Sequence, residues 1–496
     1  MTDASPETIQ RLIENSEKGL SRIEMSLPII LEARQSVIDA IEKKEERNVT
    51  LELTLVVLDS LLAEDEVIYD ISASLNALLK ATDDYTRRYY MQSLNLCFWE
   101  ACQLFVGDDG DGLLYRIEKQ SKELYQAGCQ YIARHIIDDV QKFQKDYTDK
   151  NLRDITRHYN EPIKMYESQQ ELTNIEFFAN GASQLMVIRM EVSVVSSYLL
   201  NLIVPVKKEP LMIATSKKCD LNRRFNDALY NKFNDENLRD IVGRVLGNGQ
   251  KKLDEYYRQY QNCSKAIDYF AEKNYQMSAV PEKIMSLIAL RMETHFLKCD
   301  IACSVWGYLN AASDKERSQN LRLIHITKQA ALTHIYGYNE KTRPKSLWAK
   351  IKAFDEVSKV TLKTDDIEES LKELTSNLTE DQKNSNIYTH YRYKQDYYIP
   401  VRLETFGKMI HYKELVDSQK LLNVCKALED YTHRLLFFID ETQKKEREKQ
   451  YNEWMTKIDE LIDNAGNDED AKDTLKSMRN PIDVIYGDKT DNDNVL

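Results

Sequence analysis

Residues that interrupt helices are scarce in this chain, which has only 14 glycines and 9 prolines among its 496 residues. Glycine and proline weaken helix interiors more than any other residues, so their scarcity predicts long helices joined by few tight turns. Hydrophobic residues make up 42% of the sequence, which argues against intrinsic disorder. A chain of this length has room for two or three domains. The expected fold class is all-α.

The hallmarks of secreted, membrane-spanning and DNA-coating proteins are also missing. The eight cysteines include no CxxC pair, which predicts reduced thiols and a cytoplasmic protein. The longest apolar stretch, near residues 192–206, is too short and too polar to span a bilayer, so no membrane association is expected. The start of the sequence lacks the basic and apolar pattern of a secretion signal. A net charge of −13 argues against bulk affinity for DNA but leaves room for a local basic site.

Familiar catalytic and cofactor motifs are lacking as well. The sequence contains no glycine-rich phosphate loop, no GxSxG, no HExxH and no dinucleotide fingerprint. His295, Cys299 and Cys303 share one helical face, but no fourth ligand is evident, and structural zinc sites normally have four. These three residues are interpreted as buried core residues. We therefore expect neither a metal ion nor another cofactor.

What the sequence does contain is an internal repeat at an offset of 230 residues. Residues 70–107 and 300–337 align without a gap and share nine identities. The first-copy members are Asp70, Ile71, Ser74, Leu79, Ala81, Asp84, Arg87, Ala101 and Gly107. Self-similarity at a fixed long period indicates duplicated structural units. We therefore predict two tandem up-and-down helical bundles that arose by internal duplication.

The domain boundaries are predicted from the repeat and from the few helix breakers. The first helical domain covers residues 1–204, and a proline- and lysine-containing linker covers 205–220. The second helical domain covers residues 221–445, and residues 446–496 form a charged helix followed by an acidic, mobile tail. Glycines at positions 243, 247 and 249 are expected to interrupt the helix in which they lie.

Two aspartates that occur in both copies are predicted to have a structural role. Asp70 and Asp300 lie in otherwise apolar helical segments. Buried carboxylates require partners, and Arg87 and Arg317, which also occur in both copies, are candidates for ion pairs with them. A hydrogen bond to a helix terminus is the alternative.

One local pattern carries chemistry. The segment 151–159 reads NLRDITRHY, so His158 follows Arg153 by five residues. This spacing resembles the R-x4-6-H motif of the HEPN superfamily, whose helical-bundle domains occur in prokaryotic toxins, abortive-infection proteins and CRISPR-associated ribonucleases. The resemblance covers the motif and the all-helical setting. It implies metal-independent cleavage of RNA through a 2′,3′-cyclic phosphate, with Arg153 and His158 as the catalytic pair and Arg157 and Tyr159 as auxiliary contacts.

The chemistry of this pair is consistent with that reaction. The ordinary pKa of histidine suits proton transfer from a ribose hydroxyl at neutral pH. A guanidinium group is always charged and matches the geometry of a phosphate. The second copy retains a His-Tyr pair at His390 and Tyr391, but Ser385 stands where the first copy has Arg153. The resemblance therefore implies that the second copy is degenerate, and that His390 and Tyr391 are auxiliary because HEPN sites usually form between two facing domains.

Two functions from different classes follow from these patterns. The first is a HEPN-like, RNA-directed protein, a metal-independent ribonuclease of a toxin or antiviral defence system. The second is a catalytically inactive helical scaffold or sensor subunit that binds a protein partner. RNA is the partner in the first case, and a protein partner or homo-oligomer is expected in both.

Overall fold

Every regular element in the described part of the chain is a helix, so the all-α fold class is confirmed. The computed structural model describes residues 6–43, 46, 48–107, 110–150, 152, 159, 161–203, 235–272, 280–312, 314–337, 339, 341–358, 365–376, 378–389, 411–437, 444–466 and 468–486. No helix within these ranges has the length and apolar character needed to cross a membrane. The predicted linker at 205–220 lies outside the described residues.

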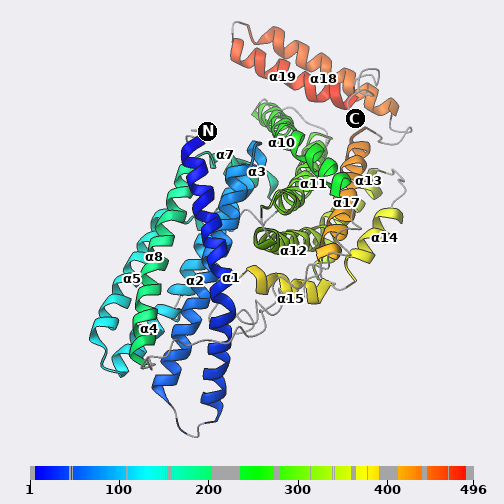
Figure 1. Ribbon diagram of the computed structural model, residues 1–496. Coiled ribbons are helices and arrows are strands. Elements are labelled where there is room, and N and C mark those ends of the chain that lie inside the picture. Colours follow the sequence, from blue (N-terminus) through cyan, green and yellow to red (C-terminus); the bar gives the residue numbers. More distant parts are fainter. Residues whose placement is uncertain are drawn as a thin grey trace.

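The first half of the chain forms a bundle of helices around α2 (Figure 1). Its helices are α1 (Pro6–Glu42), α2 (Val49–Lys80), α3 (Asp84–Phe105), α4 (Leu113–Glu123), α5 (Ala127–Tyr147), α7 (Pro162–Glu171) and α8 (Ile175–Ile203). α2 contacts α1, α3, α4 and α8, so most of its residues are buried. It is therefore the central helix of this half.

The helix ends follow from short local signals. α1 begins at Pro6, a residue favoured in the first turn. Asn48 and Asp83 cap α2 and α3, because each side chain accepts a hydrogen bond from the backbone N–H three residues further on. The turn after α3 contains Gly107, which has a φ of +74°, and this left-handed conformation is easy only for glycine.

The second half forms a corresponding set of helices around α11 (Figure 1). Its elements are α10 (Asp235–Glu272), α11 (Val280–Leu309), α12 (Asp314–Tyr336), the 3-10 helix η1 (Arg343–Lys345), α13 (Leu347–Ser358), α14 (Asp365–Leu374), α15 (Leu378–Thr389) and α17 (His411–Phe437). α11 contacts α10, α12 and α17, and it also reaches α3 and α7 of the first half. One continuous cluster of buried apolar side chains joins the two halves.

The helices of the two halves keep the spacing of the sequence repeat. The bounds of α10, α11 and α12 lie about 230 residues after those of α1, α2 and α3. Gly337 follows α12 with a φ of +76°, as Gly107 follows α3. α8 packs on α2, and α17 packs on α11. The two central helices thus have matching neighbours.

Two further helices, α18 (Lys444–Asn464) and α19 (Glu469–Tyr486), pack against each other at the top of Figure 1. Ile458, Leu461 and Leu475 form a small apolar cluster between them, and α19 also contacts α10 and α17. α18 agrees with the charged helix predicted in this region. α19 lies where the sequence predicts a mobile tail, because its few apolar residues recur at every third or fourth position within a polar composition.

The prediction that glycines interrupt the first helix of the second half is wrong, because α10 continues through Gly243, Gly247 and Gly249. A glycine in a helix interior costs about 1 kcal/mol relative to alanine, and the packing of α10 along α11 compensates for this cost. Gly249 also has a local reason. A Cβ atom at this position would lie 3.1 Å from the Sγ atom of buried Cys299 on α11, whereas one at Gly243 would meet nothing within 4 Å.

This contrast predicts opposite outcomes for two alanine substitutions in one helix. Gly243→Ala should raise the free energy of unfolding by about 1 kcal/mol, because alanine has the higher helix propensity. Gly249→Ala should be less favourable by about 1 kcal/mol or more, because the added methyl group presses on Cys299. Urea denaturation of both variants measures the difference. Equal stabilisation by the two substitutions would contradict the close approach of α10 and α11.

Candidate functional site at the junction of the two halves

Tyrosines on one face of α3 make polar contacts with the second half. The Tyr85 hydroxyl donates to Oδ1 of Asp300 on α11 at 2.6 Å. The Tyr89 hydroxyl lies 2.9 Å from Oγ1 of Thr327 on α12. Residues four apart share one side of a helix, so the spacing of Tyr85 and Tyr89 directs both rings toward the same neighbour. The hydroxyl groups satisfy polar atoms that burial would otherwise leave without water.

A third tyrosine reaches the same carboxylate from the end of the motif segment. The Tyr159 hydroxyl donates to Oδ2 of Asp300 at 2.7 Å, so both carboxylate oxygens accept a phenol hydrogen. Asp300 and Tyr159 are each only 3% exposed, and the Tyr159 ring lies 5.4 Å from the ring of His334. Burial, and then the charge of Asp300, raise the pKa of Tyr85 well above its ordinary value, so this phenol remains a proton donor.

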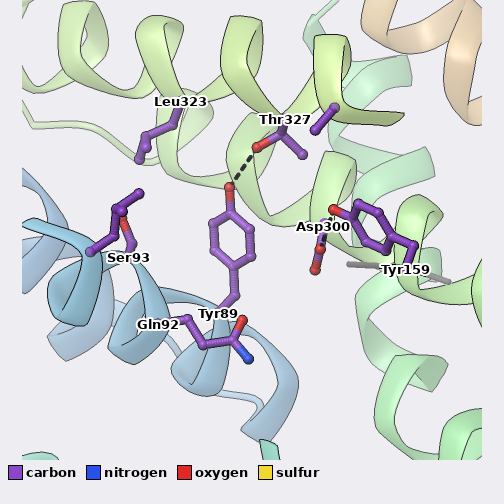
Figure 2. Close-up of a pocket in the computed structure, with 9 residues that line it drawn as sticks. Tyr89, Gln92, Ser93, Tyr159, Asp300, Leu323 and Thr327 are labelled. Carbon is purple, nitrogen blue, oxygen red and sulfur yellow. Dashed lines mark hydrogen bonds between the residues drawn. The ribbon is translucent and has the colours of Figure 1, made fainter. Parts of the chain in front are cut away.

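A small cavity lies beside these residues (Figure 2). Tyr89 extends across it to Thr327, and Tyr159 and Asp300 lie together at one side. The remaining lining residues are Gln92, Ser93, Leu96, Leu323 and Ala330. The space open to the centres of water molecules is about 40 Å³, enough for a few waters. Sites for small organic ligands are about 300–1,000 Å³, so this cavity is a hydrated part of the junction and too small for a nucleobase.

The predicted catalytic pair cannot be placed relative to this junction. Arg153, Arg157, His158, His390 and Tyr391 all lie outside the described residues. Among the predicted site residues, Tyr159 is described. It was expected to contact phosphate or base, and its hydroxyl is instead bonded to Asp300.

The two described residues that flank the catalytic pair are both anchored. Leu152 is buried, and its backbone N–H donates to Oδ1 of Asp149 at 3.0 Å. Asp149 is in turn held by Asn95 of α3, because their backbone and amide groups exchange two hydrogen bonds. Tyr159 is held by Asp300. The motif segment therefore begins against one half of the protein and ends against the other.

Three buried acidic residues of α2 form ion pairs that the sequence does not reveal, because each arginine comes from a different helix. The pairs are Asp59 with Arg34 of α1, Glu64 with Arg189 of α8 and Asp70 with Arg322 of α12. For Asp70, an ion pair was predicted, but its partner Arg322 belongs to the other half. Asp300, the corresponding residue of the second copy, accepts hydrogen bonds from two tyrosines instead of forming the suggested pair with Arg317.

Glu66 lies beside the Asp70–Arg322 pair, with its Oε2 atom 3.7 Å from Arg322. Burial, and then the Asp70 carboxylate, raise the pKa of Glu66 to about 8, although Arg322 opposes this rise. Burial raises the pKa of Asp70 to about 6, again against the effect of Arg322. At neutral pH, one arginine therefore faces one ionised carboxylate and one that holds its proton.

The second half contains two similar clusters, in each of which a glutamate of α17 bridges a histidine and a lysine. His295 and Lys298 of α11 contact Glu429, with His295 Nδ1 2.5 Å from Oε1. The other ring nitrogen, Nε2, lies 3.0 Å from the Gly249 carbonyl oxygen. Both ring nitrogens thus face acceptors, which only the doubly protonated ring satisfies. Although burial opposes ionisation, His295 and Lys298 lower the pKa of Glu429 to about 2.

The second cluster repeats this arrangement on α12. His325 and Lys328 contact Glu414 at 3.2 Å and 2.8 Å, and His325 Nε2 lies 3.2 Å from the Asp381 carbonyl oxygen. Although burial opposes ionisation, Lys328 and His325 hold the pKa of Glu414 well below its ordinary value. A His-x-x-Lys pattern occurs in both helices. That pattern is the signal by which sequence reasoning could have found the clusters.

The surroundings of His295 also answer the question of its earlier pairing with two cysteines. His295, Cys299 and Cys303 are all buried, as predicted. The described residues contain no group of three or more metal-binding side chains suitably placed for an ion. A scan against protein-family models and searches of curated proteins and of solved structures give no match to the chain. Its function is therefore inferred from its own residues.

The charge cluster on α17 predicts a large loss of stability when its acid is neutralised. Glu429→Gln leaves His295 and Lys298 without a countercharge in the interior and should lower the free energy of unfolding by about 3–5 kcal/mol. The matched control is Glu373→Gln, because Glu373 pairs with Lys420 on the surface. Its effect should stay below about 1 kcal/mol. Chemical denaturation at pH 7 measures both, and similar small losses would contradict a tight buried pair.

The raised pKa of Glu66 predicts that this residue makes the protein less stable as the pH rises. Between pH 4.5 and 8, the folded state retains a proton that the unfolded state has released, so folding becomes less favourable over this window. Glu66→Gln removes this dependence, and its stabilising effect over the wild type should grow from pH 5 to pH 8, reaching about 2 kcal/mol. Denaturation curves at four pH values measure the trend. A constant difference would show that Glu66 does not retain its proton.

Proposed function

We propose that the chain consists of two diverged copies of one helical unit. The nine identities at an offset of 230 residues support this. The matching bounds of three helix pairs add to it, as do the left-handed glycines at 107 and 337. The outer helices α8 and α17, each packed on a central helix, extend the correspondence beyond the region of sequence identity.

The proposed function of this tandem protein is HEPN-like and RNA-directed, with segment 151–159 as a metal-independent ribonuclease site. The observation that carries the proposal is the hydrogen bond from Tyr159 to Asp300, which ties the end of the Arg153–His158 motif to the other half. The resemblance to HEPN domains implies a site between two facing copies, and the anchoring of Leu152 and Tyr159 is consistent with that position.

The roles at this site follow from the chemistry of the two side chains. His158 would accept the proton of the attacking 2′-hydroxyl, and Arg153 would stabilise the negative charge that develops on the phosphate. Tyr159, whose hydroxyl is bonded to Asp300, positions the segment. The RNA would have to approach from outside the small cavity, which has room for water only.

An RNase assay in the presence of EDTA tests this proposal. The wild type should produce fragments that end in a 2′,3′-cyclic phosphate, and His158→Ala should lower the rate by about a hundredfold or more, because it removes general base catalysis. His135→Ala on the exposed side of α5 is the matched control and should not change the rate. Cleavage that survives His158→Ala would locate the activity elsewhere.

The second candidate is a helical scaffold that binds a protein partner. A specific observation favours it: strongly exposed large apolar side chains gather on α5 and α8 in the described part of the chain. Such groups are typical of protein contacts when they form a patch. A folded, monodisperse wild type that does not cleave RNA in the assay above would favour this function over the ribonuclease.

A further inference from the structure

An uncovered apolar stripe runs along the outer face of α8. It consists of Val187, Met190, Val194 and Tyr198, which are 55–68% exposed. Their spacing of three, four and four residues places them on one line along the helix. The opposite face of α8 packs on α2, α3 and α5. This helix is therefore apolar on both its inner and its outer side.

α17 provides an internal control for this stripe. α8 begins at residue 175 and α17 at residue 411, and at this offset of 236 the buried positions agree, as in Leu185 with Leu421 and Leu199 with Leu435. The four outward positions differ in character. In α17 they are occupied by exposed polar and charged residues, which are Asn423, Lys426, Asp430 and Arg434. An outer helix in this position therefore does not need an apolar outer face.

The stripe also lies in a region with very little charge. α8 has three charged residues among 29, whereas charged residues make up 30% of the chain. Arg189 is buried and paired with Glu64, Glu176 is near the start of the helix, and Glu191 is half-buried beside the stripe. Nucleic acids and anionic membranes require basic residues, which this face lacks. The chemistry that fits it is an apolar, uncharged protein surface.

We propose that the stripe is the contact surface for a second copy of this chain. With a net charge of −13, two copies repel each other except where a surface carries almost no charge, and α8 provides such a surface. An antiparallel, two-fold arrangement of two α8 helices is self-complementary. To within one residue, it places Val187 opposite Tyr198 of the second copy and Met190 opposite Val194, so a small side chain faces a large one throughout.

Helix α5 extends the proposed contact. The rings of Tyr147 at the end of α5 and Phe177 at the start of α8 lie 5.2 Å apart, and the two helices pack along their length. Counted back from Tyr147 and forward from Phe177 at about 1.5 Å per residue, exposed Tyr131 is level with Val194. Tyr131 and its neighbour Ile132 are 75% and 45% exposed. Charged residues further along α5 would then form the polar rim that surrounds an interface core.

The oligomeric state of the full-length chain tests the proposal, measured by sedimentation equilibrium over a range of concentrations. The wild type should be a dimer. A variant carrying Val187→Asn, Met190→Lys, Val194→Asp and Tyr198→Arg should be a monomer with unchanged helix content, because α17 carries these residues at the same positions. Asp430→Asn on α17 is the control and should remain dimeric. A monomeric wild type, or a four-residue variant that dimerises as the wild type does, would overturn the proposal.

Two narrower variants keep the test decisive if the four-residue variant does not fold. Val194→Asp alone should raise the dimer dissociation constant by about tenfold or more, because it buries an unpaired charge in the contact. Cross-linking tests the arrangement. Val194→Cys lies near the proposed two-fold axis and should form a disulfide between copies, whereas Tyr198→Cys lies too far from the axis to reach its counterpart. Cross-linking at position 198 and not at 194 would contradict the antiparallel arrangement.

Discussion

The pairing of buried carboxylates on α2 is the constraint on which the arrangement of the first half depends. Removing a carboxylate from water costs several kcal/mol, and only a well-placed cation and hydrogen bonds compensate for it. The acids of α2 meet arginines from α1, α8 and α12. A shift of any one of these helices by a single turn would leave two charges unpaired in the interior. Apolar burial supplies most of the driving force for folding, and these ion pairs determine which of the many compact arrangements is allowed.

The second half meets the same requirement with different chemistry. There the outer helix α17 supplies the acids, and the helices α11 and α12 supply histidine and lysine. Glu429 and Glu414 lie fifteen residues apart on α17, so they hold it to its neighbours at two separate levels. Matching helix positions are thus combined with unrelated polar contacts. This explains why sequence identity between the halves is confined to short stretches although the helices keep their spacing.

Local signals in the sequence predicted the helices and many of their ends, because capping, helical spacing and left-handed glycines act over a few residues. The start of α1 at Pro6 and the turn at Gly107 belong to this group. Contacts between distant residues were not predictable in the same way. The partner of Asp70 is 252 positions away, and nothing in the sequence around either residue identifies the other. The continuity of α10 through three glycines depends likewise on tertiary packing. For the site, the sequence pointed to the segment that ends in Tyr159, but not to its anchor Asp300, and the roles of Arg153 and His158 stay predictions.

The single core shared by both halves has a consequence for how the molecule can come apart. Tyrosines of α3 and the buried apolar cluster cross the boundary, so neither half has a complete interior by itself. A chain break anywhere between Ile203 and Asp235 would leave two fragments that still bind each other. Each would be, in effect, the obligate subunit of the other, and heat or denaturant should unfold the two together as one cooperative unit.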